Sequence, residues 1–114
     1  LAVAVGTAHG AYPKGMEPKL DFKRLAAIKA KTGNFPLVMH GSSGTDNELL
    51  RQACRQGINK VNIANDLCQA AAKAAKTADL EGNHAYDFSA VIYEEVKAKM
   101  KEMIVIYGSQ GKAE

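Results

Sequence analysis

The sequence has few cysteines, few prolines and little excess of charge of either sign. Two cysteines among 114 residues cannot form a disulfide framework, so we expect a reducing, cytoplasmic setting. The formal charge of +3 comes from 15 basic and 12 acidic residues, too small an imbalance to indicate a nucleic-acid or membrane surface. No apolar run approaches the ~20 residues of a membrane-spanning helix. With 10 Gly and 3 Pro, the chain is also neither collagen-like nor of low complexity.

Short apolar runs alternate with helical patterns along the chain. Strands are predicted at 1–8, 36–40 and 58–64, and helices at 20–33, 45–57, 65–78 and 88–103. This order predicts an α/β fold with a parallel sheet. Because such a short sheet would have an open edge, we expect residues 1–114 to be one portion of a larger single domain, a TIM (β/α)₈ barrel of about 250 residues.

Two helix starts and both cysteines have local sequence signals. Asp21 is placed to cap the first helix, and Thr45 has capping-box spacing to Glu48. Cys54 and Cys68 fall within helical patterns and belong to no CxxC motif. We expect both thiols to be buried and to act as small apolar groups.

Polar and glycine-rich residues gather directly after each predicted strand. The three groups are Thr7, His9 and Gly10; residues 40–44 (HGSSG); and Asn62, Asn65 and Asp66. The carboxyl ends of parallel strands are where α/β folds build their sites, because loops and helix N-termini converge there. The sequence therefore predicts one site at this end of the sheet.

His9 and His40 each end a predicted strand and each precedes a glycine. Ends of neighbouring strands lie roughly 5 Å apart, so the two imidazoles could share a Zn²⁺ ion. The alternative is that each ring hydrogen-bonds to backbone. His84 lies in a polar loop and is expected to be solvated.

The HGSSG loop is suited to bind phosphate. Its glycines let the backbone approach an anion, and the next helix begins just after it. Ordinary turn chemistry would favour the same residues. Asn65 and Asp66 open the following helix, either as groups near a phosphate or as plain N-cap residues.

The chain resembles a known family in five segments: GTAHGAY, PKLDFKRLAAI, PLVMHGSSG, GINKVNIANDL and GSQGKA. They are similar, in order, to the C-terminal part of the class II, metal-dependent ketose-bisphosphate aldolases. The resemblance implies that the predicted strands are the sixth, seventh and eighth of a TIM barrel. It also implies that His9 and His40 bind a catalytic Zn²⁺ ion. The third ligand and the aspartate that serves as general acid and base would lie on earlier strands, outside this chain.

The resemblance also implies which residues surround the substrate. They are Gly10, Gly41, Ser43, Asn62, Asn65 and Asp66. In the family, the glycines and the serine hold the phosphate of dihydroxyacetone phosphate, often beside a monovalent cation (Na⁺ or K⁺), and the asparagine at position 62 contacts substrate near the reacting carbon. Asn65 replaces the usual threonine, so its geometry toward phosphate differs.

The implied reaction is reversible cleavage of a ketose 1,6-bisphosphate, fructose or tagatose, with zinc as Lewis acid. No lysine Schiff base is needed, and none is assigned to Lys60. The implied partners are the sugar bisphosphate, the N-terminal remainder of the barrel, and further copies in a dimer or tetramer. Two other functions stay open: a non-catalytic sugar-phosphate-binding remnant, and a flavodoxin-like phosphate-binding domain.

Overall fold

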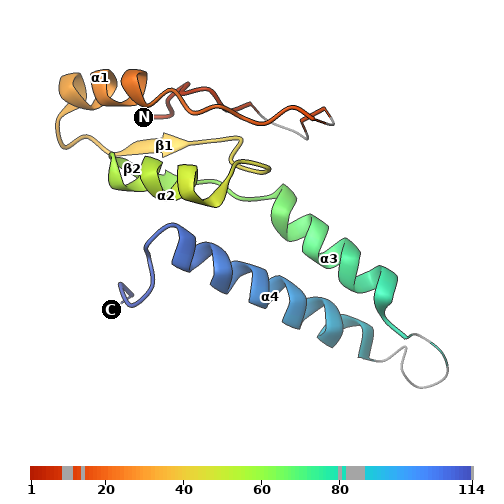
Figure 1. Cartoon of the computed structure of the whole chain (residues 1–114). Helices are drawn as coiled ribbons and strands as arrows, with labels where there is room; N and C mark the ends of the chain where they lie inside the picture. The colour runs from red at the N-terminus through yellow and green to blue at the C-terminus, as the bar shows by residue number, and fades with distance from the viewer. Residues whose placement is uncertain (9–11, 14, 80, 82–86, 114) are drawn as a thin grey trace.

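The computed structural model describes residues 1–8, 12, 13, 15–79, 81 and 87–113. Its elements, in chain order, are α1 (Phe22–Thr32), β1 (Leu37–Met39), α2 (Asn47–Arg55), β2 (Ile58–Val61), α3 (Asn65–Thr77) and α4 (Phe88–Ile106) (Figure 1). Strands β1 and β2 pair in parallel, with Val38 opposite Lys60 and Met39 opposite Val61. The predicted alternation of helices with parallel strands is confirmed for this part of the chain.

The first predicted strand, 1–8, is wrong as a strand: it contributes a single parallel bridge, between Ala2 and Val38. Two backbone hydrogen bonds form this bridge, from Val38 N–H to the carbonyl of Leu1 (2.9 Å) and from Val3 N–H to the carbonyl of Val38 (3.1 Å). The chain then turns at Gly6, whose φ is +105°. The carbonyl of Val5 accepts instead from Asp21 N–H (2.8 Å), so the segment leaves β1 after this one bridge.

Helix α1 begins as its sequence predicts, and α2 does not. Asp21 accepts a hydrogen bond from Arg24 N–H at the start of α1. The cap of α2 is Asp46, which accepts from the N–H groups of the second and third helical residues, so Thr45 is not the cap. Helix α4 continues to Ile106, three residues beyond its predicted end.

The core lies between the sheet and the helices α1, α2 and the C-terminal end of α4. Its buried apolar residues are Val5, Leu25, Leu37, Met39, Leu50, Ala53, Ile58, Met103 and Ile106. The expectation of two buried thiols is wrong, because Cys54 is only half-buried and Cys68 is exposed on α3. Both side chains lie in the helical layer, outside this core.

Helices α3 and α4 pack against each other and extend away from the sheet (Figure 1). The chain measures 60 × 40 × 21 Å, with a radius of gyration of 17.0 Å. A self-contained domain of this length would have a radius of gyration of about 13 Å. The described residues therefore form a layered slab with a projecting helix pair.

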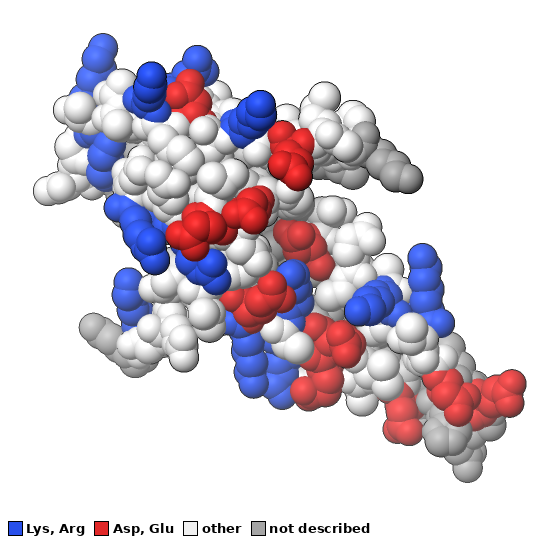
Figure 2. All heavy atoms as spheres, in the orientation of Figure 1, with Lys and Arg blue, Asp and Glu red and all other residues white. Residues whose placement is uncertain are grey.

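The surface carries mixed charge. Figure 2 shows basic and acidic side chains interleaved over one face of the molecule. Several form ion pairs along single helices, such as Arg51 with Glu48 (3.2 Å) and Lys97 with Glu94 (3.1 Å). Within the described ranges, no helix is both long enough and apolar enough to cross a membrane.

Candidate functional site

The carboxyl ends of β1 and β2 bring His40 and Asn62 together. The ladder continues one step past the strands, because Asn62 N–H donates to the carbonyl of Met39 (3.2 Å). The Asn62 amide nitrogen then lies 3.1 Å from His40 Nδ1 and 3.3 Å from His40 Nε2. Two residues predicted to share a site from separate strands are thus in contact.

Asn62 is held by further hydrogen bonds. Its backbone carbonyl accepts from the Ser42 hydroxyl (3.2 Å), and Ser42 itself is buried. Its side-chain oxygen accepts from the Lys60 ammonium. Both ends of the Asn62 amide therefore have partners, and its position is fixed from the backbone and from the side chain.

The loop after β1 approaches the N-terminal segment closely. Gly41 adopts φ of +67°, and a β-carbon there would lie 2.3 Å from the carbonyl oxygen of Ala8. The Thr7 hydroxyl donates to the carbonyl of His40 (2.6 Å). The glycine that the sequence assigns to a phosphate loop is thus required for this contact between two chain segments.

Ser43 connects the same loop to the start of α3, where its hydroxyl donates to Asp66 Oδ2 (2.8 Å). The N-cap residue of α3 is Ala64, which makes no side-chain cap bond. Asn65 and Asp66 are therefore the first two helical residues and not N-caps. Asn65 is exposed at this helix start, and Asp66 is half-buried against the loop.

Tyr107, which the sequence did not single out, lies behind this loop. Its hydroxyl is buried and has no hydrogen bond of normal geometry to the described residues. Burial raises the pKa of Tyr107 to about 12; the Ser42 side chain lowers it, and the charges of Asp66 and Cys54 add to the rise. Tyr107 reaches the loop because the C-terminal end of α4 packs on α2. No local sequence signal predicts this packing.

The described residues supply one imidazole to a possible metal centre. His40 is half-buried at a strand end, and neutral imidazole is a good zinc ligand. His9 and Gly10 lie outside the described residues, as does His84. Among the residues that the structure describes, no three His, Cys, Asp or Glu side chains converge. His40 thus fits one position of a zinc centre.

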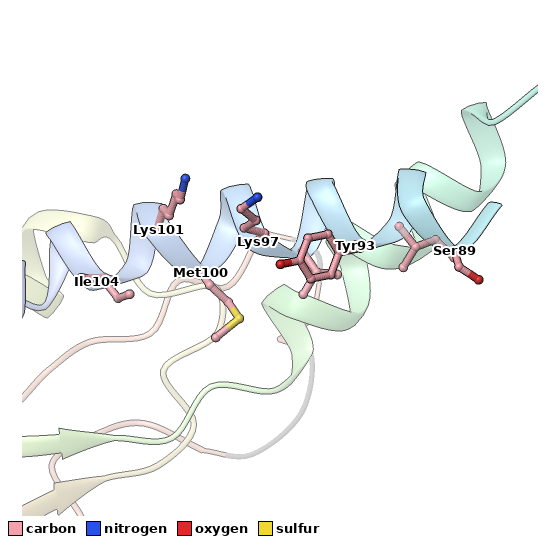
Figure 3. A pocket seen from close by; sticks show the side chains of 8 residues that line it. Ser89, Tyr93, Lys97, Met100, Lys101 and Ile104 are labelled. Atoms are coloured by element: carbon pink, nitrogen blue, oxygen red, sulfur yellow. The ribbon is translucent and has the colours of Figure 1, made fainter. Parts of the chain in front are cut away.

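An open apolar groove of about 670 Å³ runs along α4. Figure 3 shows Met100 and Ile104 on one side of the helix, while Lys97 and Lys101 point away from them. The Lys97 ammonium lies 5.1 Å from the centre of the Tyr93 ring. None of the predicted site residues lines this groove, but Met100 and Ile104 also line a neighbouring pocket of about 410 Å³ that includes Asn62.

Residues 1–112 match the family model described as fructose-bisphosphate aldolase class-II. Among solved structures, the chain is similar to the YdjI aldolase from Escherichia coli K12, with 33% identity and a TM-score of 0.83 over 99% of this chain. It is also similar to a Coccidioides immitis protein assigned to the fructose-1,6-bisphosphate aldolases, with 26% identity and a TM-score of 0.82 over 97% of this chain. The chain spans 40% of the length of the first protein and 38% of the second.

Proposed function

Because the chain belongs to the class II fructose-bisphosphate aldolase family, we propose that it is the C-terminal portion of a zinc-dependent TIM-barrel aldolase. The complete enzyme cleaves fructose 1,6-bisphosphate reversibly to dihydroxyacetone phosphate and glyceraldehyde 3-phosphate. The observation that carries the proposal is the family match over 112 of 114 residues. The contact between His40 and Asn62 at adjacent strand ends supports it.

His40, together with His9, would hold the zinc ion, and the third ligand would come from the remainder of the barrel. When bound, zinc supplies Lewis-acid stabilisation of negative charge that develops on the substrate. Asn62 presents its amide nitrogen on the same side as His40. In this position the amide can donate a hydrogen bond to a substrate oxygen and orient the substrate for cleavage.

The phosphate of the substrate would bind over the loop at 41–44 and the start of α3. Backbone N–H groups of a glycine loop and of a helix N-terminus favour an anion. Gly41, Gly10, Ser43 and Asn65 are the residues we assign to this phosphate. The Ser43 hydroxyl already donates to Asp66, so it must rotate to donate to phosphate. While the Ser43 hydroxyl donates to Asp66, its oxygen can accept a hydrogen bond or bind a monovalent cation (Na⁺ or K⁺).

The test uses the complete protein in an assay of aldol cleavage. We expect turnover of fructose 1,6-bisphosphate to disappear on chelation and to return with zinc. His40→Ala should lose zinc and turnover together, whereas the control His84→Ala should retain both. Full zinc occupancy and normal turnover in His40→Ala would contradict the metal assignment.

The same preparation distinguishes the other functions. Faster cleavage of tagatose 1,6-bisphosphate than of fructose 1,6-bisphosphate would show that the preferred substrate is the tagatose compound, with the same aldol reaction. Phosphate affinity without bound metal or cleavage would indicate a sugar-phosphate-binding remnant. We further propose a homo-oligomer, a dimer or tetramer, which sedimentation of the complete protein measures.

A further inference from the structure

We propose that Lys60 is a positioning residue that fixes the orientation of the Asn62 amide, with its nitrogen toward His40. This inference rests on the proposed function, in which Asn62 contacts the substrate. Lys60 and Asn62 are two residues apart at the end of β2, so their side chains project from the same face of the sheet. The Lys60 ammonium donates to Asn62 Oδ1, and Asn62 Nδ2 lies 3.1 Å from His40 Nδ1.

The two ends of an asparagine amide differ in chemistry. The oxygen only accepts hydrogen bonds, whereas the nitrogen only donates. An ammonium group has three donors and no acceptor, so Lys60 selects the oxygen of Asn62 and repels the nitrogen. The His40 side of Asn62 therefore receives the donor end.

This face of the sheet is not the one that packs on the core. Leu37 and Met39 are fully buried on the core side, while Lys60 is exposed and Val38, its partner in register, is half-buried. In a closed barrel the same face would point inward, where an ammonium is retained only when acceptors surround it. The Asn62 oxygen is the acceptor that the described residues offer to Lys60.

The orientation matters for the reaction. A donor amide next to a carbonyl oxygen that gains negative charge stabilises the transition state, whereas an inverted amide presents a second negative dipole. The positive charge on Lys60 also polarises the amide and strengthens its N–H donors. Lys60 thus acts on the substrate through Asn62, without touching it and without a covalent step.

The kinetic test uses the complete protein and the variants Lys60→Met, Lys60→Arg and Asn62→Ala. We expect Lys60→Met to lower kcat by about 10- to 100-fold, as a misplaced active-site group does, with little change in KM or zinc content. Lys60→Arg should recover most of the loss, because it restores a donor to Oδ1. The control Lys23→Met, at an exposed lysine on α1, should match the wild type.

A double-mutant cycle separates action through Asn62 from a general effect of charge or folding. In the Asn62→Ala background, Lys60→Met should change kcat by less than about 2-fold. An equal loss in both backgrounds would overturn the proposal.

A structural measurement keeps the inference independent of the assigned reaction. Neutron diffraction distinguishes the nitrogen of an amide from its oxygen. We expect one Asn62 orientation in the wild type and Lys60→Arg, and a mixed or inverted one in Lys60→Met. A single unchanged orientation in Lys60→Met would overturn the role of Lys60. Absence of aldol cleavage by the wild type would instead overturn the proposed function and leave the neutron result valid.

Discussion

A β-carbon on Gly41 would lie 2.3 Å from the carbonyl oxygen of Ala8 and 2.6 Å from its carbonyl carbon. Backbone from two chain segments, 33 residues apart, therefore meets where only a hydrogen atom fits. The Thr7 hydroxyl bonded to the carbonyl of His40 (2.6 Å) holds the same two segments together. This contact sets the position of His40 and of the loop that follows it.

Gly41→Ala should destabilise the protein more than the same change at Gly108. Both glycines have left-handed backbone, with φ of +67° and +69°, which costs an alanine about 1–2 kcal/mol. Gly108 has open space where the β-carbon would go. We therefore expect Gly108→Ala to lose only the free energy of the left-handed backbone. Gly41→Ala should add about 1–3 kcal/mol of overpacking. Denaturant unfolding of the two variants measures the difference, and equal losses would contradict the close contact.

Much of the fold is predictable from local sequence, and the exceptions have identifiable causes. Asp21 caps α1 as predicted, because no other capping side chain is adjacent to it. At α2, Thr45 and Asp46 are neighbours and both can cap. The helix uses Asp46, while the Thr45 hydroxyl is buried without a hydrogen-bond partner among the described residues. Local spacing does not decide between two such neighbours.

The candidate site also has residues whose contacts the sequence predicts and residues whose contacts it does not. Alternation along parallel strands predicts that His40 and Asn62 end neighbouring strands, and they are in contact. The strand at 1–8 is wrong because the chain leaves β1 after one bridge, with the Val5 carbonyl bonded to Asp21 N–H and a turn at Gly6. Tyr107 reaches the loop at 41–44 only through the packing of α4, and no local pattern predicts such a long-range contact.

Ser43→Ala should raise the KM for a ketose bisphosphate more than it lowers kcat. The variant loses one hydroxyl at the proposed phosphate site, worth about 1.5–3 kcal/mol when bonded to a charged group. It also leaves Asp66 without its hydrogen bond from Ser43 (2.8 Å). Steady-state kinetics of the complete protein measures both constants. Ser89→Ala on α4 is the matched control, and a pure kcat effect in Ser43→Ala would exclude a role in binding.

Tyr107 should make stability fall as the pH rises from 10 to 12. The tyrosine of the unfolded chain ionises near its ordinary pKa of 10.0, whereas burial holds the folded pKa at about 12. Between these values the unfolded state loses a proton that the folded state keeps, so unfolding becomes easier. Below pH 10 the Tyr107 phenol is protonated in both the folded and the unfolded state, so its contribution to the free energy of unfolding is fully present.

Thermal unfolding of wild type and Tyr107→Phe across this pH range isolates that contribution. The Tm of Tyr107→Phe should fall less with rising pH than the Tm of the wild type, because the variant has no phenol to ionise at this position. At neutral pH it should be as stable as the wild type or slightly more so, since the hydroxyl it removes has no regular hydrogen bond among the described residues. Tyr93→Phe, at an exposed position (62% exposed), is the control. Identical pH profiles for wild type and Tyr107→Phe would contradict the effect of burial.

Residues 1–114 alone should be inactive as an aldolase and should self-associate. The resemblance implies that the acid–base residue and the third zinc ligand lie on earlier strands. The radius of gyration of 17.0 Å also exceeds the about 13 Å of a self-contained domain. The two-stranded sheet and its bridged first segment leave strand edges that pair readily with other chains. Large apolar side chains, including Phe35 and Met100, are 57% and 49% exposed.

Sedimentation of the purified 114-residue chain with zinc, combined with the cleavage assay, tests both expectations. Activity should return only when the N-terminal part of the barrel is added, covalently or as a second polypeptide. A monomer of this length with robust turnover would overturn the barrel placement and the assignment of the acid–base residue to another part of the protein.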